Sequence, residues 1–85
     1  MNPTSNIRVL VAEDDFLVCE EISRALKQLA FEQVGTATNG EKAIEMTESL
    51  RPDVVLMDIR MPKLDGLAAT KIIQERCPTP IVVLT

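Results

Sequence analysis

Three short apolar runs stand out in the chain: Ile7-Arg8-Val9-Leu10-Val11-Ala12, Val54-Val55-Leu56-Met57 and Ile81-Val82-Val83-Leu84. They are mostly β-branched, and their apolar residues are continuous rather than alternating with polar ones. This pattern is typical of strands that are buried on both faces of a parallel sheet. A weaker strand is predicted at Gln33-Val34-Gly35-Thr36-Ala37.

Helical periodicities separate these strands. The first helix is predicted from about Asp15 to Ala30, and its apolar face consists of Val18, Ile22, Ala25, Leu26 and Leu29. The second begins at Thr38-Asn39-Gly40-Glu41, which has capping-box spacing, and ends before Pro52. The third runs from Asp65, a predicted N-cap, to Arg76. Strands that alternate with helices in this way predict an α/β fold, with a parallel sheet covered by helices on both faces.

Composition excludes several classes of function. The 85 residues are 46% hydrophobic and 26% charged, as expected for one globular domain or part of one. A net charge of −4 and only two aromatic residues argue against a nucleic-acid-binding surface. The absence of histidine removes histidine-based catalytic triads and histidine-ligated zinc.

The location of the protein is suggested by its N-terminal segment and its cysteines. Residues 1–6 form a polar tail, and the apolar run that follows contains Arg8, so it is neither a signal sequence nor a membrane span. Cys19 and Cys77 form no CxxC pair and are interpreted as free thiols. We therefore expect a soluble, cytoplasmic protein.

Carboxylates follow two of the predicted strands. The first run leads into Glu13-Asp14-Asp15, the third strand leads into Asp58, and the last strand leads into the hydroxyl of Thr85. If these strands are neighbours, the side chains converge at the carboxyl edge of the sheet, where open α/β folds bind ligands. The alternative is that Asp14 and Asp15 only cap the following helix.

A cluster of this kind favours a metal ion. Two carboxylates about 4 Å apart repel each other by roughly 4 kcal/mol at an effective dielectric constant of 20. Mg²⁺, which binds a few carboxylates and a carbonyl while it keeps several waters, offsets this repulsion and attracts phosphoryl groups. Without histidine or a reactive cysteine motif, an aspartate is the best candidate for a covalent nucleophile.

These segments together resemble a response-regulator receiver domain. The resemblance rests on Val11-Ala12-Glu13-Asp14-Asp15, on residues 53–62, on Leu64-Asp65-Gly66 and on residues 81–85. It implies a flavodoxin-like parallel sheet of order 2-1-3-4, formed by a partial receiver domain at residues 7–85.

The resemblance also assigns roles to individual residues. Asp58 matches the aspartate that accepts a phosphoryl group from the phosphohistidine of a sensor histidine kinase or a phosphotransfer protein. Asp14 matches a direct Mg²⁺ ligand, Glu13 a ligand acting mainly through water, and Arg60 a residue that offers its backbone carbonyl. Thr85 matches the hydroxyl residue that contacts the phosphoryl group. The implied function is a phosphoacceptor in a two-component phosphorelay, with at most weak autophosphorylation and autodephosphorylation activity.

The sequence departs from the family pattern at one point, because the fifth strand, the lysine that follows it and the last two helices have no counterpart here. We expect a truncated receiver whose final strand, Ile81–Leu84, has a free edge through which the chain forms a homodimer. One alternative is a self-associating fragment that no longer accepts a phosphoryl group. Another is a phosphatase of the haloacid dehalogenase type, which requires an aspartate where Glu13 stands.

Overall fold

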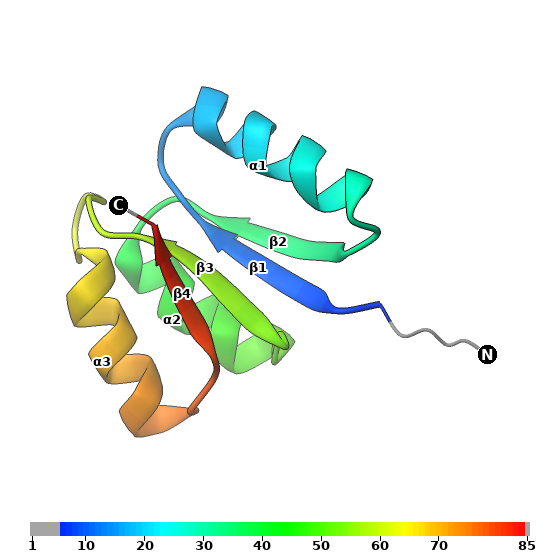
Figure 1. The fold of residues 1–85 in the computed structure, drawn as a ribbon. Coiled ribbons are helices and arrows are strands. Elements are labelled where there is room, and N and C mark those ends of the chain that lie inside the picture. The colour runs from blue at the N-terminus through cyan, green and yellow to red at the C-terminus, as the bar shows by residue number, and fades with distance from the viewer. Residues whose placement is uncertain (1–5, 85) are drawn as a thin grey trace.

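A single sheet with helices on both faces makes up the computed structural model, which describes residues 6–84 (Figure 1). The elements alternate along the chain as β1 (Arg8–Ala12), α1 (Phe16–Gln28), β2 (Glu32–Ala37), α2 (Gly40–Leu50), β3 (Val54–Asp58), α3 (Gly66–Arg76) and β4 (Ile81–Leu84). The four strands are parallel and lie in the order β2-β1-β3-β4, as expected.

The register between β1 and β3 brings the ends of these two strands to the same level. Val9 is paired with Val54, and Ala12 is paired with Met57. The next residue along each strand is an acid, Glu13 after Ala12 and Asp58 after Met57. Strand pairing therefore places these two carboxyl groups beside each other.

The sheet separates two apolar clusters. On one face, α2 and α3 pack against Leu10, Val55 and Met57 (Figure 1). On the other face, α1 contributes the buried side chain of Leu26, which packs against Val9 and Val11. Because helices cover both faces of β1, residues Val9 to Ala12 are almost completely buried, as the continuous apolar run predicted.

Helix α1 differs from its prediction in how much of its apolar face is covered. Of the five residues predicted on that face, only Leu26 is buried, whereas Ala25 is exposed and the side chain of Leu29 is 62% exposed. The helix ends at Gln28, so Leu29 lies at its C-cap. No second helix lies beside α1 on this face in the described chain, and the margin of its apolar stripe therefore remains in solvent (Figure 1).

The caps of the helices mostly agree with the sequence. Asp15 caps α1, and Asp65 caps α3 by accepting a hydrogen bond of 2.8 Å from the Ala68 N–H. The capping residue of α2 is Asn39, whose Oδ1 accepts from the Lys42 N–H at 2.8 Å, so the predicted start at Thr38 is wrong by one residue. None of the helices in residues 6–84 has the combination of length and apolarity needed to cross a membrane.

Candidate functional site

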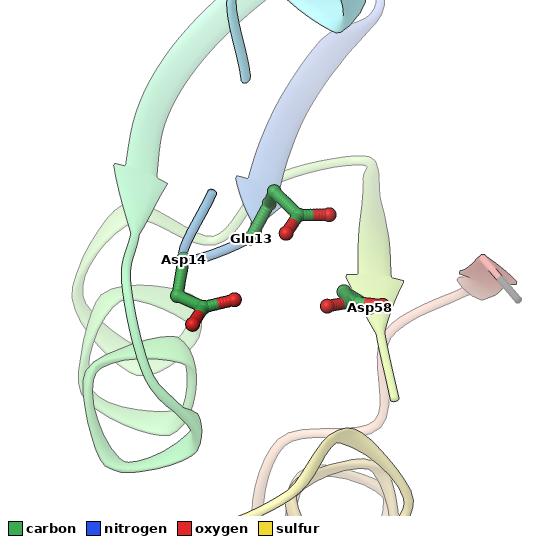
Figure 2. A group of neighbouring side chains, drawn as sticks. All are labelled: Glu13, Asp14 and Asp58. Atoms are coloured by element: carbon green, nitrogen blue, oxygen red, sulfur yellow. The ribbon is translucent and has the colours of Figure 1, made fainter. Parts of the chain in front are cut away.

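Three acidic side chains meet at the carboxyl edge of the sheet. Glu13 and Asp14 come from the segment after β1, and Asp58 is the last residue of β3 (Figure 2). Each offers a carboxylate oxygen, and these three oxygens lie within 4.8 Å of one another. Glu13 is buried, Asp58 is partly buried and Asp14 is exposed, so the cluster extends from the protein interior to the solvent.

Glu13 is held in place by contacts at its backbone and at its side chain. Its N–H donates to the Ala37 carbonyl at the end of β2, with an N···O distance of 2.9 Å. Its carbonyl accepts a hydrogen bond from the Cys19 thiol at 3.3 Å, and its Oε2 accepts from the Asp15 N–H at 3.1 Å. These contacts connect the buried carboxylate to β2 and to the start of α1.

The electrostatic state of Glu13 reflects its surroundings. Burial raises the pKa of this carboxyl above its ordinary value of 4.5, and the hydrogen bond from the Asp15 N–H partly opposes that rise. The negative charges of Asp58 and Asp14 raise the pKa further. Binding of a cation beside these carboxylates is therefore electrostatically favourable.

The same acidic groups affect the pKa of the Cys19 thiol. Burial raises the pKa of this thiol, and the negative charges of Glu13, Asp15 and Asp14 add to the effect. A thiol with a raised pKa stays protonated at neutral pH. This matches its position in the structure, where it donates a hydrogen bond to the Glu13 carbonyl.

A pocket opens beside the carboxylate cluster. Its volume is about 390 Å³, and it is lined by Asp58, Ile59, Arg60 and Leu84. Leu84, at the end of β4, supplies an apolar wall, whereas Arg60 is exposed in the segment that follows β3. The pocket therefore adjoins Asp58, the last residue of β3.

The structure brings together most of the residues that the sequence singled out. Glu13, Asp14 and Asp58 form one cluster, and Arg60 lines the pocket next to Asp58. The capping interpretation holds for Asp15, whose Oδ1 accepts from the Leu17 N–H at 2.9 Å. Asp14, in contrast, belongs to the carboxylate cluster.

Two features of the site fall outside the sequence-based interpretation. Thr85, predicted to supply a hydroxyl, lies outside the described residues. The contact of Cys19 with the Glu13 carbonyl was not predicted. A cysteine four residues beyond the acidic stretch was the only available signal, and it does not specify this partner.

Comparison with known proteins gives a consistent result. A family model described as the response regulator receiver domain matches residues 9–85. A protein-glutamate methylesterase/protein-glutamine glutaminase from Archaeoglobus fulgidus is 46% identical over 79 residues, which are 93% of this chain and 23% of the relative. The transcriptional regulatory protein PdtaR from Mycobacterium tuberculosis is 42% identical over 78 residues, which are 92% of this chain and 38% of the relative. The chain thus spans well under half the length of either protein.

Solved structures show the same likeness. The response regulator domain of Thermotoga maritima CheB superposes with a TM-score of 0.89 at 36% identity, covering 93% of this chain and 60% of that one. The signal receiver domain of the putative response regulator NarL from Mycobacterium tuberculosis gives a TM-score of 0.88 at 33% identity, covering 94% of this chain and 66% of that one. The family match takes in β1 from its second residue, the other three strands and the segments that carry the three carboxylates, and this chain therefore belongs to the family of response regulator receiver domains.

Proposed function

We propose that this receiver domain is a phosphoacceptor in a two-component phosphorelay and that Asp58 carries the phosphoryl group. The observation that carries the proposal is the position of Asp58: the residue lines a pocket of about 390 Å³, and its carboxylate lies within 4.8 Å of two other carboxylates. A partly buried carboxylate next to a pocket, and beside a site that favours cations, suits nucleophilic attack on phosphorus.

The proposed reaction transfers a phosphoryl group from nitrogen to oxygen. A carboxylate oxygen of Asp58 forms a bond to phosphorus, the P–N bond of the donor phosphohistidine breaks, and the bonding electron pair stays on the imidazole. The product is an acyl phosphate on Asp58. The 85 residues contain no histidine, so the donor histidine lies outside this segment; a sensor histidine kinase or a phosphotransfer protein fits that role.

The residues of the cluster suit Mg²⁺. Three carboxylates within 4.8 Å of one another provide hard oxygen donors, which this ion prefers. We assign direct contact to Asp14 and Asp58, and a water-mediated role to Glu13, whose Oε2 already accepts the Asp15 N–H. The Arg60 carbonyl completes the proposed ligand set, and the Thr85 hydroxyl is proposed to contact the phosphoryl group. When bound, Mg²⁺ neutralises charge on the phosphoryl oxygens during transfer.

We also propose that the 85-residue chain self-associates in the cytoplasm through β4. In the described sheet, β4 pairs with β3 on one side and has no strand on its other side. The side chains of Val82 and Val83 are 50% and 37% exposed. An apolar strand with an unpaired edge favours pairing with a second copy. The alternative function is that of a self-associating fragment that no longer accepts phosphoryl groups. Whether the chain becomes phosphorylated distinguishes this alternative from the phosphoacceptor.

The first prediction concerns the metal. Replacing Asp14 by Asn should weaken Mg²⁺ binding roughly 10- to 100-fold, because a charged oxygen ligand is lost. Asp15→Asn is the matched control: it removes the same charge one residue away, and Asn still caps α1. Isothermal titration calorimetry measures both affinities. Equal affinities for wild type and Asp14→Asn, or equal losses in the two variants, would contradict the assignment.

The second prediction concerns the chemistry. Incubation with acetyl phosphate and Mg²⁺ should add one phosphoryl group to the wild type and none to Asp58→Asn. Asp65→Asn, at the exposed N-cap of α3 in the same connection, should be labelled like the wild type. Intact-mass spectrometry with peptide mapping detects the adduct. Labelling that persists in Asp58→Asn, or that maps to Asp14 or Asp15, would refute the role of Asp58.

The third prediction concerns self-association. Analytical ultracentrifugation at micromolar concentration should find a dimer for the 85-residue chain and a monomer for Val82→Lys, because a charge on an edge strand opposes strand pairing. Thr36→Lys places the same charge on β2, the strand at the opposite edge, and should leave the dimer intact. A folded wild-type monomer, with an unfolding transition independent of concentration, would overturn the proposal.

A further inference from the structure

The first residue of α3, Gly66, touches the backbone of the residue proposed to carry the phosphoryl group. A Cβ atom at this position would collide with the Asp58 carbonyl oxygen and would lie 2.8 Å from the Asp58 carbonyl carbon and 2.9 Å from the Ile59 Cα. All three are backbone atoms, which cannot turn aside as the end of a side chain can. Gly66 does not have a positive φ, so this position requires glycine for space and not for backbone conformation.

The segment between β3 and α3 is folded back onto this contact. The Gly66 N–H donates to the Ile59 carbonyl at 2.8 Å, and the Leu64 N–H donates to the Pro62 carbonyl at 2.7 Å. Met61 is buried in the core cluster beneath α2 and α3. The start of α3 thus closes the loop that begins at Asp58 and contains Arg60.

A second glycine approaches the same loop at Leu64. A Cβ atom at Gly40, the first residue of α2, would collide with the Leu64 carbonyl oxygen and would lie 2.7 Å from the Leu64 carbonyl carbon. Helix α2 follows β2, whose last residue, Ala37, accepts the Glu13 N–H. A continuous series of contacts therefore runs from Glu13 through β2 and Gly40 to Leu64, and from there through Gly66 to Asp58.

We propose that Gly66 and Gly40 are positioning residues that set the separation between the two halves of the carboxylate cluster. Gly66 allows α3 to close on the Asp58 backbone, and Gly40 allows α2 to approach Leu64 in the same loop. A methyl group at either position displaces the loop and moves Asp58 and Arg60 relative to Glu13 and Asp14. The expected change in Mg²⁺ affinity rests on the proposed Mg²⁺ site, whereas the expected displacement of the loop does not.

The chain provides a matched control at Gly35 in β2. A Cβ atom there would lie 2.6 Å from the Met46 Cε and 3.2 Å from the Leu50 Cδ1. Both atoms are ends of flexible side chains, which can move without shifting a backbone segment. Gly35→Ala therefore adds the same methyl group and perturbs the core, but it leaves the loop in place.

The test is an NMR-monitored Mg²⁺ titration of the ¹⁵N-labelled 85-residue chain and the three glycine-to-alanine variants. We expect Gly66→Ala to weaken Mg²⁺ binding by roughly tenfold or more. Before Mg²⁺ is added, it should already shift the amide signals of Asp58 and, across the cluster, of Glu13 and Asp14. Gly40→Ala should act in the same direction through Leu64. Gly35→Ala should keep the wild-type affinity and the wild-type signals at residues 13, 14 and 58.

Each other outcome is decisive. Wild-type Mg²⁺ affinity in a folded Gly66→Ala variant would overturn the proposal. Loss of folding in both Gly66→Ala and Gly40→Ala, while Gly35→Ala folds, would also overturn it, because the glycine contacts would then stabilise the fold as a whole. If the wild type itself binds no Mg²⁺, the proposed metal site fails. The metal-free signals then decide the positioning role: shifts that reach residues 13 and 14 support it, and shifts confined to the substituted positions refute it.

Discussion

The pairing of β1 with β3 is the constraint on which the site depends. Because Ala12 is paired with Met57, the acids that follow them in the two strands lie side by side, and Asp14 joins them. Two carboxylates about 4 Å apart repel each other by roughly 4 kcal/mol at an effective dielectric constant of 20. The fully buried residues Val9 to Ala12 hold β1 in this register despite that repulsion. A site that concentrates negative charge in this way favours a cation.

The pKa of Glu13 connects this repulsion to stability. Its carboxyl group has a higher pKa in the folded chain than the ordinary value of 4.5. At a pH below that value, Glu13 is protonated in both the folded and the unfolded chain, and its contribution to folding stability is complete. The contribution is lost as the pH rises through the folded-state pKa, because the folded chain must then carry a buried charge beside Asp58 and Asp14. A cation bound at the cluster would compensate for this charge at neutral pH, so cation binding and folding would stabilise each other.

The fold was largely predictable because its strands are unusually clear in the sequence. Residues 54–57 and 81–84 are continuous apolar runs, and Asp65 and Pro52 mark helix boundaries that the structure confirms to within a residue or two. The strand order came from the resemblance to receiver domains, since local patterns carry no information about which strands are neighbours. The exposed margin of α1 was not predictable. Periodicity shows that a helix has an apolar face, but it does not show how much of that face is covered by other elements.

The candidate site was predictable in less detail than the fold. Acids after buried strands predicted the cluster, but the burial of Glu13 and its contact with the Cys19 thiol depend on how α1 is placed over the sheet. In the sequence, Asp65-Gly66 indicates only a turn and the start of a helix. Its approach to the Asp58 backbone is a tertiary contact between two segments that the sequence alone does not place together. Residue types therefore indicated the chemistry, whereas the distances within the site required the structure.

The central claim is that three carboxylates are held in mutual repulsion at one edge of the sheet. The most direct test is a ¹³C NMR titration of the Glu13 side-chain carboxyl group in metal-free wild type and in Asp58→Asn. The account predicts a pKa above 4.5 in the wild type and a lower one in Asp58→Asn, where one source of repulsion is lost but burial continues to raise the value. An identical Glu13 pKa in the two proteins, or a wild-type value at or below 4.5, would contradict it.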